Sequence, residues 1–276
     1  MSNFCFKFSS DASETLTSIL EPNVCNKVEW LPAKEILLDD CVHQTTGKKS
    51  IFKVNDLVVF YVVSSDENNH VVSIDKYNQS DLIPAKYEGG MKIWECTYDL
   101  VNYLSTSDKP INFEKKSVLD LGCGAGYLGL TAFKLGAESI HFQDYNEEVL
   151  YQLTIPNLIS NIDKENDSSN FKFFTGDWES FVKLNNFQYD IILTSETIYN
   201  TQNHRKLHMT LKKKLKKDGI IFLAAKTYYF GVGGGTRQFE ALVNEEGVFD
   251  STVCWKCSSG NIKKIKLIFL KKNDSQ

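Results

Sequence analysis

The sequence has few of the features that mark membrane, secreted or disordered chains. Proline occurs only five times in 276 residues and hydrophobic residues make up 42% of the chain, which excludes a disordered or collagen-like protein. No apolar run approaches the ~18 residues that a membrane span needs. The first residues, MSNFCFKFSSD, lack the basic and then apolar order of a secretory signal. We therefore expect a folded protein of the cytoplasm, with the nucleus or nucleolus as a further location, and no membrane contact.

Cysteine and histidine show no metal-binding or disulfide pattern. The seven cysteines are odd in number and scattered, whereas disulfide frameworks favour even counts in short secreted chains. Cys254 and Cys257 have the spacing of metal ligands, but no second Cys/His pair accompanies them, so we interpret them as two thiols in a strand. His204 and His208 lie four residues apart without a partner acid or thiol. We predict no metal site.

The charge balance argues against a protein that wraps nucleic acid. The chain carries 31 basic and 35 acidic residues, a formal net charge of −4. One basic run, KKKLKK at 212–217, ends a predicted helix, where cations complement the helix dipole. A nuclear-import patch, or a dock for ribosomal RNA or a pre-ribosomal particle, is the alternative that the sequence leaves open.

The hydrophobic pattern divides the chain into an extension, 1–80, and a domain, 81–276. In the extension, Leu57 to Val63 form a β-branched and aromatic run of strand length, followed by a polar loop at 64–69. From residue 117 on, strand-like runs alternate with helix-length segments, which predicts an α/β fold with a doubly wound, mostly parallel sheet. The predicted strands are 117–121, 139–143, 171–174, 189–194 and 219–225, with 248–253 and 265–270 forming a β-rich end, and the predicted helices are 126–135, 147–160 and 203–216.

A glycine-rich turn follows the first predicted strand of the domain. It reads Asp120-Leu-Gly122-Cys-Gly124-Ala-Gly126 and precedes a predicted helix, the context in which such a turn lets a nucleotide approach the backbone. Asp144 ends the next strand about twenty residues later, where a carboxylate can accept hydrogen bonds from both ribose hydroxyls. Together these features predict an adenosine-containing cofactor rather than a bare turn.

Two cofactor classes share this geometry. We expect Asp120, at the start of the turn, to favour a cationic cofactor and disfavour a pyrophosphate. The order Asp-x-Gly-x-Gly-x-Gly also resembles that of the seven-stranded, Rossmann-like (class I) methyltransferases. S-adenosyl-L-methionine is therefore the predicted cofactor, and a nicotinamide-dependent dehydrogenase is the weaker interpretation.

Polar residues follow the third and fourth predicted strands. Gly176-Asp177-Trp178 stand where methyltransferases of this fold place an acidic and an aromatic residue around the adenine, although an ordinary Gly-Asp turn is the alternative. Glu196 and Tyr199 follow the fourth strand, where the acceptor atom meets the methyl group in related folds. They are our candidate catalytic residues, and a rim carboxylate with a packed aromatic is the alternative.

Longer segments resemble one family closely. They are YEGGMKIWECTYDL at 87–100, DLGCG at 120–124, HFQDYN at 141–146, LTSETIYN at 193–200 and YFGVGGG at 229–235. In this order they resemble the protein-histidine N-methyltransferase branch of the methyltransferase-like family, over roughly residues 81–270. The resemblance implies methyl transfer from S-adenosylmethionine to Nτ of a histidine in large-subunit ribosomal protein three, by a protein that we expect to be monomeric.

The resemblance also implies a set of cofactor-binding positions. Asp177 stands where the family often has Glu, and Met91 where Leu is usual; neither change removes a group that the pocket needs. The implied residues, with Asp120 and Gly124 added from the turn itself, are Ile93, Trp94, Glu95, Cys96, Thr97, Asp120, Gly122, Gly124, Gln143, Asp144, Tyr145, Gly176, Asp177, Trp178 and Ser195.

Methylation of a neutral imidazole needs orientation more than a strong base, because its unperturbed pKa of ~6.5 leaves most of it nucleophilic at cytosolic pH. Our hypothesis is that Glu196, or a backbone carbonyl near it, accepts a hydrogen bond from the second ring nitrogen. Gly231 to Gly235 form either a mobile lip or a structural turn, and Gly234→Ala should raise the KM for protein substrate if the segment is a lip. A lysine methyltransferase of the same family and a non-catalytic ribosome-assembly factor that binds S-adenosylmethionine are the alternative functions.

Overall fold

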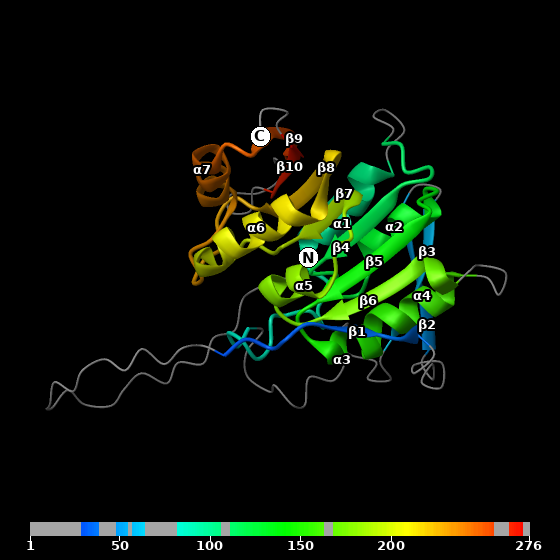
Figure 1. Ribbon diagram of the computed structural model, residues 1–276. Helices are drawn as coiled ribbons and strands as arrows, with labels where there is room; N and C mark the ends of the chain where they lie inside the picture. The colour runs from blue at the N-terminus through cyan, green and yellow to red at the C-terminus, as the bar shows by residue number, and fades with distance from the viewer. Residues whose placement is uncertain are drawn as a thin grey trace, which may run out of the picture.

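One eight-stranded sheet with helices on both faces forms the centre of the protein (Figure 1). The computed structural model describes residues 29–38, 48–54, 57–63, 82–105, 111–162, 168–256 and 265–272. The strand order is β1-β6-β5-β4-β7-β8-β10-β9. The seven strands β4 to β10 are the predicted ones, and β1 adds an eighth at the edge.

Five parallel strands form the middle of the sheet, and their bounds are β4 (Ser117–Leu121), β5 (Ser139–Asp144), β6 (Phe171–Thr175), β7 (Tyr189–Ser195) and β8 (Leu215–Lys226). Their near-continuous apolar sequences suit strands buried on both faces. β5 and β7 flank β4 on opposite sides, so the chain reverses its strand order there. In such sheets this reversal opens a crevice at the carboxyl ends of the strands.

The C-terminal strands close the sheet in an antiparallel arrangement. β10 (Ile265–Lys272) lies between β8 and β9 (Phe249–Lys256) and is antiparallel to both. The predicted β-rich end is therefore confirmed. β8 begins at Leu215, inside the segment predicted as helix, because Leu215 already pairs with Tyr189 of β7.

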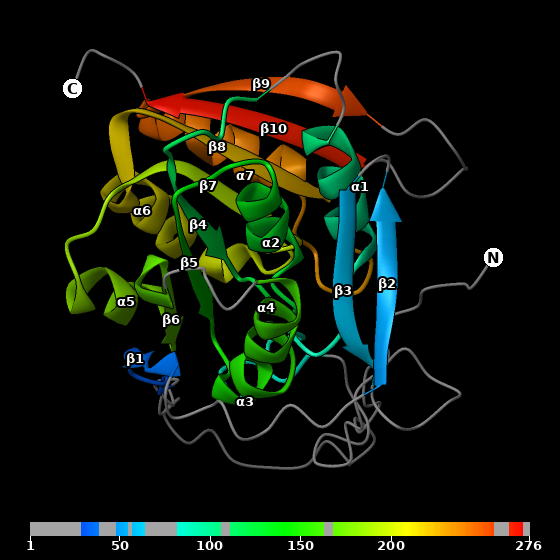
Figure 2. The ribbon, with the colours of Figure 1, turned by 90° about the vertical axis from the view of Figure 1, so that its right-hand side faces the viewer.

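The helices form one layer on each face of the sheet (Figure 2). On one face lie α1 (Glu95–Leu104), α2 (Tyr127–Lys134), α3 (Glu147–Val149) and α4 (Ile155–Asn161), and on the other lie α5 (Trp178–Leu184), α6 (His204–Lys214) and α7 (Thr236–Glu246). The helix predicted at 147–160 is interrupted by a π-helical turn, Leu150–Thr154. α1, α5 and α7 were not among the predicted helices.

Described parts of the 1–80 segment pack against the domain. β1 (Lys34–Ile36) runs antiparallel to β6, and β2 (Lys48–Val54) pairs with β3 (Leu57–Val63) in a separate hairpin. The predicted strand 57–63 is confirmed, whereas the predicted loop at 64–69 lies outside the described residues. Figure 2 shows the hairpin outside α2 and α4, where the Val59 side chain is buried and Tyr61 meets Tyr127 edge to face.

The basic run at 212–217 is not a uniform exposed surface. α6 ends at Lys214, whose buried ammonium donates to the carbonyl and the side-chain oxygen of Asn185, each at 2.7 Å, and burial lowers its pKa to about 8. Lys216 forms an ion pair with Asp190 at 2.8 Å. Two of the run's five lysines are thus engaged within the fold.

The described residues contain no helix long and apolar enough to cross a membrane, and no group of three or more His, Cys, Asp or Glu side chains arranged to hold a metal ion. Cys254 lies in β9 as a reduced cysteine, and Cys257 lies outside the described part of the chain.

Candidate active site

A cavity lies at the carboxyl ends of the parallel strands. Together with the open space at its mouth, the cavity has a volume of about 970 Å³. The turn after β4, the ends of β5, β6 and β7, and the segment before α1 all contribute to its wall.

The glycine-rich turn forms the floor of the cavity. Gly122 and Gly124 have φ values of +67° and +50°, and a Cβ on Gly122 would lie 2.7 Å from the Thr197 methyl group. Thr154 Oγ1 donates to the Gly124 carbonyl at 2.6 Å, and Asn157 Nδ2 donates to the Ala125 carbonyl at 2.9 Å. The π-helical turn in front of α4 thus brings polar side chains onto the exposed carbonyls of the turn.

The Asp144 carboxylate is fixed beside the glycine-rich turn. Its Oδ2 accepts from the Gly124 backbone N–H at 2.9 Å, and its Oδ1 accepts from Asn146 N–H at 3.1 Å. Burial raises the pKa of Asp144 to about 6, although these backbone hydrogen bonds oppose the shift. A Cβ on Gly90 would lie 3.0 Å from Oδ1, so the 87–91 segment covers this carboxylate closely.

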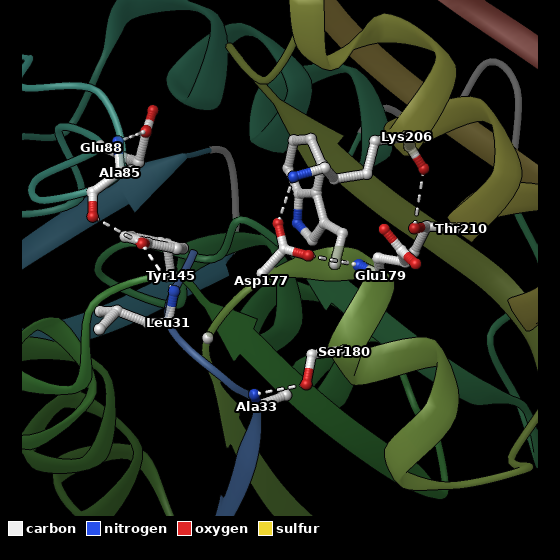
Figure 3. A network of polar contacts seen from close by, with 12 residues as sticks. Leu31, Ala33, Ala85, Glu88, Tyr145, Asp177, Glu179, Ser180, Lys206 and Thr210 are labelled. Carbon is white, nitrogen blue, oxygen red and sulfur yellow. Dashed lines mark hydrogen bonds and ion pairs between the residues drawn. The ribbon is translucent and has the colours of Figure 1, made fainter. Parts of the chain in front are cut away.

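The loop after β6 forms one end wall. Gln143 Nε2 donates to the Gly176 carbonyl at 2.8 Å, and Trp178 Nε1 donates to Gln143 Oε1 at 3.0 Å. Asp177 caps α5 by accepting from Glu179 N–H at 3.0 Å, and its other oxygen pairs with Lys206 (Figure 3). Gln143 therefore positions Trp178 without lining the cavity itself.

Glu196 lies at the opposite end, directly after β7. Its backbone adopts a φ of +59°, which non-glycine residues seldom do, and its N–H donates to the Ala224 carbonyl of β8. The Tyr229 hydroxyl donates to one carboxylate oxygen, Cys96 N–H donates to the other at 3.4 Å, and Lys226 Nζ lies 3.9 Å away. The carboxylate is thus held in place by groups from three elements.

A second tyrosine and carboxylate pair lies beside the first. The Tyr199 hydroxyl donates to Glu88 Oε2, and the Ala85 N–H donates to Glu88 Oε1 at 3.0 Å. The rings of Tyr199 and Tyr229 are 6.4 Å apart in an edge-to-face arrangement. Burial, with the negative charge of Glu88 beside it, raises the pKa of Tyr199.

The start of α1 is attached to the end of β7. Thr97 Oγ1 donates to Ser195 Oγ at 3.2 Å, and Trp94 Nε1 donates to the Gly89 carbonyl at 3.0 Å. Lys92 Nζ lies 4.6 Å from the centre of the Trp94 ring. These contacts turn part of the 93–97 stretch toward the cavity.

The structure brings most of the predicted site residues together. Those that line the cavity are Ile93, Trp94, Thr97, Gly122, Gly124, Asp144, Tyr145, Gly176, Asp177, Trp178, Ser195, Glu196 and Tyr199. Glu95, Cys96, Asp120 and Gln143 are not among the lining residues.

Asp120 lies beneath the turn rather than facing the cavity. It is fully buried, and its Oδ2 accepts from the Gly129 N–H of α2 at 2.8 Å. Burial raises its pKa well above the usual range of a carboxyl group. Asp120 therefore connects β4 to α2. The expected preference for a cationic cofactor over a pyrophosphate must come from other acidic residues.

Several lining residues were not predicted. Those with no role assigned from the sequence include Trp30, Glu88, Gly90, Lys92, Tyr127, Thr197, Asn203, Lys206 and Tyr229. Five of them fall within the unusual segments 87–100, 193–200 and 229–235, and this position was the signal that could have indicated them: Glu88, Gly90, Lys92, Thr197 and Tyr229. Trp30 carried none, because it is a single tryptophan in a weakly patterned segment.

The glycine-rich segment 231–235 is a tightly fitted turn. Gly234 N–H donates to the Tyr199 carbonyl at 2.9 Å, and Tyr229 N–H donates to the Gly234 carbonyl at 3.0 Å. A Cβ on Gly234 would lie 2.2 Å from the Tyr199 carbonyl oxygen. Gly234→Ala would therefore displace backbone instead of merely stiffening a lip, and the structural turn is the interpretation that the contacts favour.

The cavity fits a cationic, adenosine-containing cofactor. Among the described residues, its lining carries four carboxylates (Glu88, Asp144, Asp177 and Glu196) and two ammonium groups (Lys92 and Lys206). This balance favours a sulfonium and amino group and disfavours a pyrophosphate. The glycine backbone, the fixed Asp144 carboxylate and the aromatic residues around the loop after β6 complete a site for S-adenosylmethionine. The fold and the site together define a class I S-adenosylmethionine-dependent methyltransferase.

Comparisons with known proteins give the family. The family described as "Lysine methyltransferase" matches residues 84–230. "Histidine protein methyltransferase 1 homolog" of Bos taurus is 44% identical over 88% of this chain and 74% of its own length. The homolog of that name from Mus musculus is 37% identical over 84% of this chain and 73% of its own length. The chain belongs to the histidine protein methyltransferase family, and it is an enzyme that uses S-adenosylmethionine.

Solved structures agree on the fold. A protein described as a SAM-dependent methyltransferase from Streptococcus mutans superposes with a TM-score of 0.53, at 16% identity, over 81% of this chain and 56% of its own. A methyltransferase structure complexed with SAH has the same TM-score at 15% identity, again over 81% of this chain and 56% of its own. At this identity the likeness shows the fold alone.

Proposed function

We propose that this enzyme transfers the methyl group of S-adenosylmethionine to Nτ of a histidine in large-subunit ribosomal protein three. Its family supports a protein histidine as the acceptor, and the family resemblance of the sequence supports the ribosomal protein. Such a substrate would be met in the cytoplasm, or in the nucleus during ribosome assembly.

The choice of histidine as the acceptor rests on the hydrogen bonds that two carboxylates accept at the Tyr199 end of the cavity. Glu88 and Glu196 each accept a hydrogen bond from a tyrosine hydroxyl. A lysine acceptor, with an unperturbed pKa near ~10.4, must lose a proton before it can attack, whereas an imidazole is already neutral at cytosolic pH. Carboxylates held in this way suit an acceptor that needs orientation more than deprotonation.

The bound cofactor would supply an electrophilic methyl group on a sulfonium. Glu196, directly after β7, would hold the imidazole in line with it, which can lower the barrier by several kcal/mol through orientation alone. Glu196 lines the cavity and would accept from the protonated second ring nitrogen, leaving Nτ to attack. Tyr199, through Glu88, would fix the opposite side of this pocket.

A protein acceptor also has a surface beside the cavity mouth to contact. Tyr229 is buried and lines the cavity, but its neighbours Tyr228 and Phe230 are 47% and 62% exposed. Their rings lie 5.1 Å apart, edge to face. We propose that apolar residues flanking the acceptor histidine pack on this pair.

The test is a transfer assay with radiolabelled S-adenosylmethionine and an extract from cells that lack this protein. Labelled Nτ-methylhistidine in large-subunit ribosomal protein three is the expected result. Methyllysine in the labelled band would show that the acceptor is a lysine, as in the description of the matching family, and would overturn the proposed acceptor. Label on a histidine of another protein would overturn only the proposed substrate. Tight cofactor binding without any label would favour a non-catalytic assembly factor.

A further inference from the structure

Residues 31–36, which precede every sequence motif of the site, are attached to the base-binding end of the cavity. Leu31 N–H donates to the Tyr145 hydroxyl at 3.1 Å, and the Leu31 carbonyl accepts from Asp177 N–H at 2.9 Å. Ala33 N–H donates to Ser180 Oγ at 2.8 Å, and β1 continues the attachment by pairing with β6 (Figure 3).

The loop after β6 is shaped for this segment. A Cβ on Gly176, whose φ is +92°, would lie 2.5 Å from the Pro32 carbonyl oxygen and 2.6 Å from Ala33 Cα. Only glycine allows the two backbones to approach so closely. The same Gly176 lines the cavity, so the N-terminal segment and the cofactor site share one wall.

Trp30 extends this wall into the cavity. Its ring meets Tyr145 edge to face at 5.8 Å, and the Lys206 ammonium lies 3.6 Å from its centre. Lys206 is in turn ion-paired with Asp177. All four side chains line the cavity, although they come from four separate parts of the chain.

We propose that Trp30 and Lys206 are cofactor-site residues that form, with Tyr145 and Asp177, the wall against which the purine base packs. An aromatic plane stiffened by a cation is a surface suited to a planar heteroaromatic ring. The ion pair to Asp177 offsets the lysine charge, so the wall does not repel a cationic cofactor. The proposal concerns the cofactor only and does not depend on the acceptor.

The experiment measures calorimetric Kd values for S-adenosylhomocysteine and for adenosine, which keeps the base and the sugar but lacks the amino acid. Trp30→Ala should raise the Kd values of both ligands by the same factor, about tenfold. Trp30→Phe should keep most of the affinity. Lys206→Met should raise both Kd values about threefold, because the Trp30 ring loses the ammonium that holds it. A Tm measured for each variant separates loss of affinity from loss of folding.

Matched controls use residues outside the cavity. Phe187 is 48% exposed and also has a lysine ammonium over its ring, at 5.3 Å, and Lys183 is ion-paired to Glu179 on the surface of α5. Phe187→Ala and Lys183→Met should leave both Kd values unchanged. Unchanged Kd values in Trp30→Ala, or a loss confined to S-adenosylhomocysteine, would overturn the proposal.

Discussion

The two ends of the cavity hold their carboxylates differently. At the cofactor end, Asp144 and Asp177 accept hydrogen bonds from backbone N–H groups within the turns that follow their own or a neighbouring strand. At the proposed acceptor end, Glu88 and Glu196 accept from tyrosine hydroxyls 111 and 33 residues away in the sequence. Both ends also use the other kind of donor, since Lys206 pairs with Asp177 and the Ala85 and Cys96 N–H groups donate to Glu88 and Glu196. The two ends differ in the tyrosine hydroxyls, which reach their carboxylates only in the folded protein.

This difference matches what each end has to do. Backbone donors are independent of side-chain identity, so they suit a site for one invariant cofactor. Tyrosine hydroxyls can be removed singly without changing the backbone, so they suit a site that selects an acceptor. We therefore expect substitutions at the two ends to separate cofactor affinity from turnover.

The largest effect is expected from Asp144→Asn at the cofactor end. The variant keeps the shape of the side chain but loses the charge that strengthens hydrogen bonds to ribose hydroxyls, a loss of about 2 to 3 kcal/mol, or up to roughly 100-fold in affinity. Calorimetry with S-adenosylhomocysteine measures it. A Kd within twofold of wild type would show that Asp144 does not bind the sugar.

Two neighbouring glycines test how tightly the acceptor end is fitted. Gly234→Ala should lower the free energy of unfolding by about 2 to 3 kcal/mol, because the Cβ collides with the backbone of residues 198 and 199. Gly233→Ala, with no atom within 4 Å but a φ of +92°, should cost only about 1 kcal/mol. Denaturant titration compares them, and equal losses would mean that the close approach to Tyr199 is unimportant.

Changes to Glu196 or to its hydrogen-bond donor Tyr229 should lower turnover without changing the affinity for cofactor. Tyr229→Phe leaves Glu196 without its hydroxyl donor, and Glu196→Gln removes the charge; we expect each to lower kcat about tenfold or more while the Kd for cofactor stays within twofold. Single-turnover transfer and calorimetry give the two values. If Glu196→Gln and Glu196→Ala both kept full turnover with unchanged cofactor binding, Glu196 would not orient the acceptor.

Cofactor binding should weaken in acid. The pKa of Asp144 is raised to about 6, and only the ionised carboxylate can accept from two hydroxyls, so the Kd should rise about tenfold per pH unit below 6 and level off above it. Asp144→Asn should flatten this profile. Asp99, whose pKa is also raised to about 6 but which does not line the cavity, provides the control: Asp99→Asn should leave the profile unchanged.

The smallest effect is expected at the exposed aromatic pair. Tyr228→Ser with Phe230→Ser should raise the KM for the protein substrate about threefold to tenfold and leave the Kd for cofactor unchanged, since neither side chain lines the cavity. Steady-state kinetics would give the KM of the variant for the intact substrate protein and for a short peptide around the acceptor histidine. An unchanged KM for the intact protein would place the docking surface elsewhere.

Local and long-range features also differ in how well the sequence predicted them. Strands β4 to β8 were recognisable because each contains a short apolar run next to polar or glycine residues, and the carboxyl ends of β5, β6 and β7 located Asp144, Asp177 and Glu196. α5 was missed because its seven residues are too few to show a helical period, although Asp177 caps its start. α1 and α7, which begin without a side-chain cap, were missed as well. The π-helical turn at Leu150–Thr154 was missed because periodicity alone shows a continuous helix there.

By itself the sequence determined the parallel sheet, the glycine-rich turn and the acids after the strands, because these depend on residues close together in the chain. Tertiary structure alone decided which groups meet those acids. It placed Asp120 beneath the turn, joined Tyr199 to Glu88 and Tyr229 to Glu196, and brought Trp30 over Lys206. The physical reason is that such pairs are selected by packing between elements distant in the sequence, and no local pattern records that packing.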